Sequence, residues 1–99
     1  MKTPVITSKD YTVYLEEHEG FLFIHCDCYR WSKEVKTNLI KDFETLRSVL
    51  RQNIYAFHEI WDDKHLKFLK MFGFTYRSNL VGLDGVERML FERKYQNGY

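Results

Sequence analysis

The sequence predicts a single mixed α+β domain, in which two helices cover a central sheet of parallel and antiparallel strands. Two observations carry this prediction. Apolar residues recur at three- and four-residue steps in two segments, which is the period of one helix face. β-branched and aromatic residues gather in the segments before, between and after them, which is typical of strands. The expected order is β-β-α-β-α-β-β, and its middle needs crossover connections and therefore some parallel pairing.

The first predicted unit is a hairpin that follows an extended N-terminal stretch, residues 1–10. Residues 11–15 and 21–29 have strand-like composition, and the polar segment between them ends in Gly20. Side chains alternate between the two faces of a strand, so the more apolar face should meet the core. On the second strand that face carries Leu22, Ile24, Cys26 and Cys28.

A long helix of about five turns is predicted after Ser32. A serine hydroxyl can accept a hydrogen bond from an otherwise unpaired amide of the first turn, so Ser32 is the expected N-cap. Asn53 is the expected stop. The apolar stripe of this helix consists of Val35, Leu39, Ile40, Phe43, Leu46, Val49 and Leu50.

A shorter helix is predicted to begin at Asp62 or Asp63, whose negative charges suit a helix N-terminus. It should end at Gly73, because glycine adopts the left-handed conformation at little cost. Its buried stripe consists of Leu66, Phe68, Leu69 and Phe72.

Strands are expected on both sides of this second helix. Residues 54–61 precede it and are rich in aromatic and β-branched residues. A strand restarts at Phe74, and a closing hairpin joins residues 80–83 to residues 86–95. The Asp-Gly pair at residues 84–85 predicts the turn of this hairpin.

Composition excludes several classes of protein. The net charge is +1 and the charges are interspersed, which argues against a nucleic-acid-binding surface. No run approaches the ~18 apolar residues of a membrane span, and the N-terminus lacks the apolar run of a signal peptide. We therefore expect one domain over residues 1–99, with residues 96–99 frayed. The expected location is the cytoplasm, or a virion into which the protein is packed from the host cytoplasm.

A resemblance to a known family rests on residues 65–74, His-Leu-Lys-Phe-Leu-Lys-Met-Phe-Gly-Phe, which indicate a short helix, a glycine and a strand. Together with the element order, this segment resembles the core of the GCN5-related N-acetyltransferase (GNAT) family over residues 11–95. The family's first strand and first two helices have no counterpart. The same segment, with Tyr29-Arg30-Trp31, is also similar to the acetyltransferase-like internal virion proteins of short-tailed coliphages, which implies a phage origin.

The resemblance also implies where chemistry should lie. In the GNAT family the pyrophosphate of acetyl-CoA binds at the N-terminus of the long helix, through a glycine-rich turn. Arg30 matches the first position of that pattern, but Lys33 and Val35 occupy the glycine positions, and their side chains obstruct close backbone approach. Leu69 occupies the position at which the family often has a tyrosine that acts as the general acid. We therefore expect a non-catalytic protein without a cofactor, acting through protein contacts in a virion or on a host factor.

Two alternatives stay open. A minimal acetyl-CoA-dependent N-acetyltransferase would hold the anionic groups of the cofactor with Arg30, Ser32, Lys33 and Lys36, and Tyr76 would replace the missing acid. The other alternative is a small phage regulator that counters a host defence.

The aromatic residues suggest a contact surface, because they exceed what a core of this size holds. Exposed aromatic residues on strand faces are common where proteins meet. We therefore expect a protein partner or a homodimer. The interface candidates are Tyr14, Phe21, Phe23, Tyr29, Trp31 and Trp61.

The histidines and cysteines do not predict a metal site or a catalytic thiol. His25 and Cys26 point to opposite faces of one strand, so they are poorly placed to share a zinc ion. A cysteine nucleophile paired with His58 lacks an orienting group in the sequence. Cys26 and Cys28 are therefore expected to be free thiols.

Overall fold

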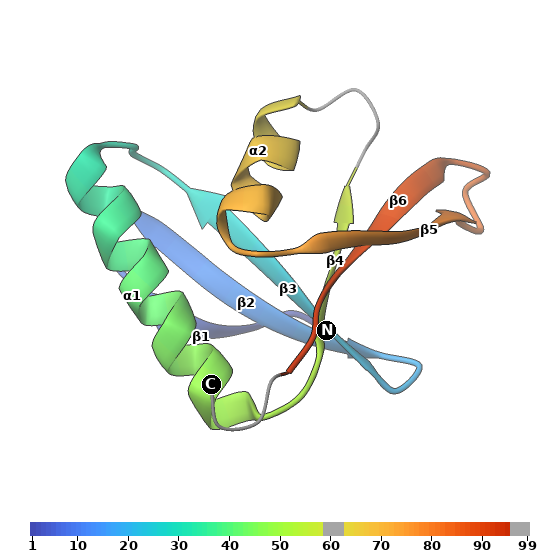
Figure 1. Ribbon diagram of the computed structural model, residues 1–99, viewed down its shortest axis with the longest axis horizontal. Coiled ribbons are helices and arrows are strands. Elements are labelled where there is room, and N and C mark those ends of the chain that lie inside the picture. The colour runs from blue at the N-terminus through green and yellow to red at the C-terminus, as the bar shows by residue number, and fades with distance from the viewer. Residues whose placement is uncertain (59–62, 96–99) are drawn as a thin grey trace.

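The computed structural model describes residues 1–58 and 63–95, which form six strands and two helices. The strands are β1 (Thr3–Thr7), β2 (Tyr11–His18), β3 (Phe21–Cys28), β4 (Ile54–His58), β5 (Thr75–Val81) and β6 (Glu87–Arg93). The helices are α1 (Lys33–Leu50) and α2 (Asp63–Met71), and both pack on one face of the sheet (Figure 1). The sheet has the order β1-β2-β3-β4-β6-β5, with β3 and β4 parallel. The predicted mixed fold is confirmed.

The first strand, β1, adds an element to the predicted order, because part of the extended N-terminal stretch pairs with the sheet. It pairs antiparallel with β2, and its register is irregular between Pro4 and Ile6. Proline cannot donate to a strand ladder, so it is tolerated on an edge strand such as this one. These residues form a strand because they pair with β2, although their own sequence gives only a weak strand signal.

The long helix α1 begins as predicted and ends earlier than predicted. The Ser32 hydroxyl accepts a hydrogen bond from the Val35 amide at 3.1 Å, so Ser32 is the N-cap. At the other end Arg51 adopts the left-handed conformation, and its amide donates to the Arg47 carbonyl at 3.3 Å. The helix therefore stops before Asn53, the expected terminator.

The short helix α2 ends as predicted, because Gly73 has a φ of +80°. A side chain at Gly73 would also collide with the Arg93 guanidinium, which donates to the Phe72 carbonyl. Of the two expected caps, Asp63 is the first residue of the helix and Asp62 lies outside the described residues. Neither described helix combines the length and the apolar character needed to cross a membrane.

The main core lies between the two helices and the sheet face that they cover. Cys26 and Ile24 pack against it from β3, as the alternation of that strand predicted. Each large apolar side chain buried here contributes roughly 1.5–3 kcal/mol. The buried members are Tyr11, Val13, Val35, Leu39, Phe43, Ile54, Ala56, Leu69, Phe72, Phe74 and Phe91.

The opposite side of the sheet, called the open face below, carries neither of the described helices. A second small cluster of Phe23, Tyr55 and Leu90 is buried there. The Phe23 ring stacks on the Phe57 ring with centroids 4.7 Å apart. Phe57 is 38% exposed, so this face combines buried and accessible aromatic rings.

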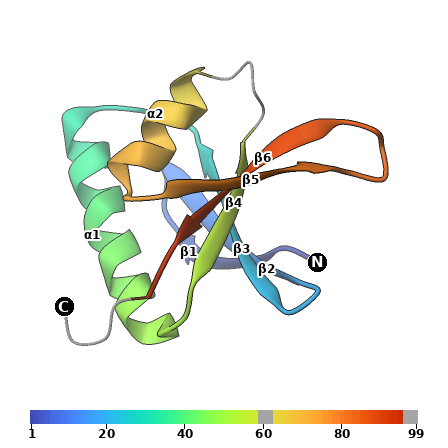
Figure 2. The same ribbon diagram turned by 45° about the vertical axis from the view of Figure 1, so that its right-hand side comes forward.

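The two parallel strands diverge, and this divergence is the feature of the fold that matters most for function. In the described residues β3 and β4 pair at Phe23 and Tyr55, near their N-terminal ends. By contrast, β3 pairs with β2 along its whole length. Beyond the Phe23–Tyr55 pair the strands separate, and α2 lies over the gap between their C-terminal ends (Figures 1 and 2).

Candidate functional site

The gap between β3 and β4 holds a cavity of about 650 Å³, called the apolar cavity below. Its walls come from both strands and from both helices. Most of the wall is hydrocarbon or thiol, which suits an extended uncharged group. Side chains that form this wall include Cys26, Cys28, Leu39, Phe43, Ala56 and Leu69.

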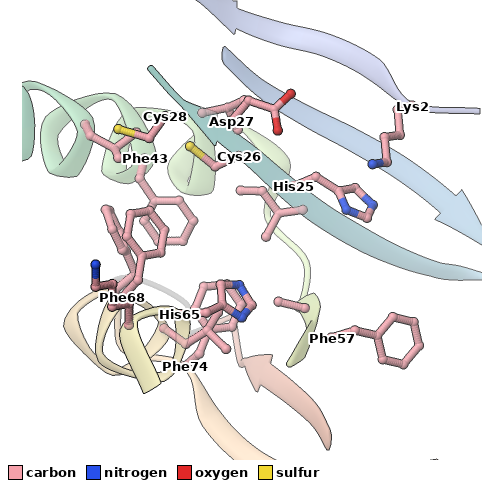
Figure 3. A pocket seen from close by; sticks show the side chains of 17 residues that line it. Lys2, His25, Cys26, Asp27, Cys28, Phe43, Phe57, His65, Phe68 and Phe74 are labelled. Atoms are coloured by element: carbon pink, nitrogen blue, oxygen red, sulfur yellow. The ribbon is translucent and has the colours of Figure 1, made fainter. Parts of the chain in front are cut away.

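Side chains reach the apolar cavity from both faces of the sheet. Cys26 and Cys28 project toward α1, whereas His25 and Phe57 project toward the open face from either side of the gap (Figure 3). Successive residues of a strand alternate in this way. The lining residues on the open-face side are Lys2, His25, Asp27 and Phe57, which together are called the open-face rim below.

A second cavity of about 750 Å³, called the basic cavity, adjoins the first at Cys28, Lys64 and Phe68. It lies beside the N-terminus of α1, where the helix dipole favours negative charge. No carboxylate is found among the described residues that line it. Its cationic side chains are Arg30, Lys36, Lys64 and Lys67. This composition suits a polyanion such as a phosphate ester.

The structure brings together two of the four predicted anion-binding residues. Arg30 and Lys36 line the basic cavity. Ser32 uses its hydroxyl to cap α1, and Lys33 is exposed and lines neither cavity. Lys64 and Lys67 of α2 were not predicted, because only the packing of α2 beside the start of α1 places them there.

The two positions considered for a general acid differ in location. Leu69 is 3% exposed and lines the apolar cavity, so no proton donor stands there. Tyr76 lies on β5, exposed, and its hydroxyl donates to Asn79 Oδ1 at 2.7 Å. Tyr76 lines neither cavity, and its role as an acid stays a prediction.

Cys26 and Cys28 are free thiols in different environments. Burial, reinforced by the nearby Cys28 and Asp27, raises the pKa of Cys26 to about 12, so this thiol stays protonated near neutral pH. Cys28 is exposed, and its thiol donates to the Arg30 carbonyl at 3.2 Å. The described residues bring no three potential metal ligands together.

The sequence analysis missed two side-chain contacts beside the apolar cavity that involve histidine. His25 Nε2 lies 3.0 Å from Glu16 Oε1, across the β2–β3 hairpin. His58 Nδ1 lies 3.1 Å from His65 Nδ1, which joins the end of β4 to α2. A predicted first strand that continued beyond residue 15 would have included Glu16, but only the register of β2 against β3 brings Glu16 to His25.

The interface candidates are distributed over several environments. Phe21 and Tyr29 are exposed on the open face, and Tyr14 is half-buried there. Phe23 is buried instead, because Tyr55 and Phe57 cover it. Trp31 is 51% exposed, and its ring lies 6.2 Å from that of Phe68 on α2. The last candidate, Trp61, lies outside the described residues.

Comparisons with known proteins identify the fold. No family model and no curated protein sequence matches the chain. Ribosomal-protein-S5-alanine acetyltransferase from Vibrio fischeri matches with a TM-score of 0.69 and 13% identity, over 91% of this chain and 56% of that chain. A candidate phosphinothricin N-acetyltransferase matches with a TM-score of 0.69 and 15% identity, over 89% of this chain and 65% of that chain. The chain has a GNAT-like fold.

A third GNAT-like structure corrects one expectation. The candidate acetyltransferase yncA from Salmonella typhimurium matches with a TM-score of 0.63 and 11% identity, over 89% of this chain and 59% of that chain. That structure holds acetyl-CoA. This finding contradicts the expectation, drawn from the sequence, of a protein without a cofactor. The chain spans 56 to 65% of the length of these three proteins.

Proposed function

We propose that this GNAT-like chain binds acetyl-CoA and transfers the acetyl group to an amine. One observation carries the proposal: an apolar cavity between diverging strands continues into a cationic cavity at a helix N-terminus. Acetyl-CoA has the matching chemistry, because a long uncharged arm links its thioester to its phosphates. The acetyltransferases that share this fold support the same function.

The phosphate end of the cofactor fits the basic cavity. Arg30 can bind phosphate oxygens with two parallel hydrogen bonds, while Lys36, Lys64 and Lys67 add compact positive charges. These side chains offset the loss of a glycine-rich cradle. Part of the helix N-terminus is already used, because the Val35 amide donates to Ser32.

The uncharged arm fits the apolar cavity. From Cys28, where the two cavities meet, to Ile24 near the closed end, β3 spans four residues, or about 13 Å. When the phosphates occupy the basic cavity, the thioester is placed at the closed end of the apolar cavity. Acetyl-CoA supplies the acetyl group there in activated form, and the chain supplies binding, orientation and proton transfer.

Calorimetric titration with acetyl-CoA tests the binding step. Lys36→Glu places a negative charge in the basic cavity, and we expect affinity to fall by roughly tenfold or more, the loss of about one charge-assisted hydrogen bond. Lys41→Glu is the matched control, since Lys41 is exposed on the same helix and lines neither cavity. No binding by the unaltered protein, or equal losses in both variants, would contradict the proposal.

Mass spectrometry of acetylated products tests the transfer step. The neighbours suggest two amine acceptors, a peptide that begins with alanine and phosphinothricin. Acetyl-CoA binding without transfer to either acceptor would support the non-catalytic reading of the sequence instead. The phage virion resemblance, the protein partner or homodimer, and the place in a host cytoplasm or virion stay predictions.

A further inference from the structure

We propose that His25, oriented by Glu16, is the general base of this site, and that the acceptor amine reaches it from the open face. The inference rests on the proposed acetyl transfer and adds to it a proton acceptor and a side of entry. It also gives the site a group that can transfer protons, which Leu69 cannot do at the position considered for a general acid.

The position of His25 follows from the shape of the site. The apolar cavity joins the basic cavity at Cys28 and closes toward Phe23, where β3 and β4 pair. His25 stands next to Ile24 near this closed end, on the rim that faces away from the helices (Figure 3). Cofactor phosphates in the basic cavity therefore put the thioester within the part of the gap that His25 borders.

The contact with Glu16 orients the histidine ring. A carboxylate accepts hydrogen bonds, so the 3.0 Å contact from His25 Nε2 to Glu16 Oε1 places a proton on Nε2. The lone pair of the neutral ring is then on Nδ1, where it can accept a proton. Desolvation opposes ionisation of Glu16, yet His25 and the N-terminal amine hold the pKa of Glu16 below its usual value. Glu16 is thus a carboxylate at neutral pH and a positioning residue.

Charge distinguishes this entry from the other end of the site. An amine acceptor is a cation before it reacts, and the cations of the basic cavity repel it. On the open face, Glu16 from β2 and Asp27 from β3 lie to either side of His25 and balance the positive charges of Lys2 and the N-terminal amine, so this side does not repel a cation as the basic cavity does. The other ionisable groups that face His25 are Tyr14 from β2, Lys2, and the N-terminal amine, 3.5 Å from Glu16.

The proton balance is complete with groups already named. The ammonium ion first releases one proton to solvent. The neutral amine nitrogen then forms a bond to the acetyl carbon, the bond from that carbon to sulfur breaks, and one further proton moves from nitrogen to sulfur. His25 takes the proton at Nδ1 as the nitrogen–carbon bond forms. The resulting imidazolium is the proton donor for the departing thiolate, so the ring returns to its neutral form.

Two variants test the proposal, with one matched control. His25→Gln removes the base, and we expect kcat for acetylation of the alanine peptide to fall by roughly a hundredfold to ten-thousandfold. Acetyl-CoA affinity, measured by calorimetry, should stay unchanged. His18→Gln is the control, because His18 is an exposed histidine of the same face on β2 and lines neither cavity. Glu16→Gln should cause a smaller loss in kcat, since His25 keeps its ring but loses the carboxylate that orients it.

A readout without cofactor accompanies these assays. Nitrogen NMR of the protein labelled at histidine should show His25 protonated on Nε2, and Glu16→Gln should weaken that preference. Unchanged transfer in His25→Gln, or a proton on Nδ1 in the unaltered protein, overturns the base assignment while cofactor binding stands. Failure of the unaltered protein to bind acetyl-CoA overturns the proposed function itself, and the base assignment with it.

Discussion

The basic cavity takes its charges from two helices and the loop before α1, whereas most groups of the open-face rim come from strands that meet through their register. Arg30, Lys36, Lys64 and Lys67 line this cavity together, and its described lining residues include no carboxylate. At the rim, Glu16 and Asp27 flank His25. The two ends of the site thus differ in net charge as well as in construction, because Lys2 and the N-terminal amine offset Glu16 and Asp27 at the rim. A polyanion and an ammonium ion would approach from different sides and meet at the apolar cavity.

The apolar cavity is the link between the two ends, so blocking it should have the largest effect. Cys26→Phe places a ring in the gap, and we expect measurable acetyl-CoA binding to disappear although the basic cavity is intact. Overpacking should also lower the free energy of unfolding by about 1–3 kcal/mol.

Cys26→Ala is the control for this variant, because it leaves the gap open. Calorimetry and denaturant unfolding of both variants separate lost binding from lost stability. Binding that survives in a folded Cys26→Phe protein would show that the cofactor avoids the gap.

The two cysteines should differ strongly in reactivity, which distinguishes the inner wall from the junction of the cavities. With a pKa of about 12, Cys26 carries a thiolate fraction on the order of 10⁻⁴ at pH 8, and this fraction rises as pH increases. Cys28 is exposed, so iodoacetamide should modify it first, and acetyl-CoA should protect it. Mass spectrometry of modified peptides over time measures both rates. Cys28→Ala isolates the Cys26 rate, and fast modification of Cys26 in that variant would contradict its burial.

Much of the fold could be predicted because it depends on local patterns. The stripe of α1, the Ser32 cap and the glycine at the end of α2 each act within a few residues. The shared location of Arg30 and Lys36 could be predicted for the same reason, since both lie near one helix start, and their binding of an anion stays a prediction. β1 was missed because its order comes from pairing with β2 rather than from its own residues.

The open-face rim could not be predicted, because long-range pairing creates it. His25 and Glu16 are nine positions apart, and only the register of β2 against β3 brings them together. The divergence of β3 from β4 depends on where their pairing stops, and no local residue pattern marks that point. Phe23 was assigned to an interface for a related reason, because the rings that bury it come from β4.

A charge change at the junction of the cavities should have an intermediate effect. Lys64 lines both cavities, so Lys64→Glu should weaken acetyl-CoA binding by roughly tenfold, again near the value of one charge-assisted hydrogen bond. Added salt should reduce the difference from the unaltered protein, because it screens exposed charges. Lys70→Glu on the same helix is the control, since Lys70 is exposed and lines neither cavity. Equal losses in both variants would mean that net charge, rather than this cavity, governs affinity.

The smallest effect is expected at Tyr76, which the sequence analysis considered as a substitute acid. Tyr76→Phe removes a hydroxyl that donates to Asn79, and the ring keeps its edge contact with Phe91 at 6.0 Å. An acid must lie within hydrogen-bond reach of the group that it protonates. Tyr76 lines neither cavity, so kcat and kcat/KM for acetyl transfer should stay unchanged while His25→Gln lowers both. A loss in Tyr76→Phe comparable to that in His25→Gln would move the proton transfer to β5 and would require the acetyl group to bind outside the gap.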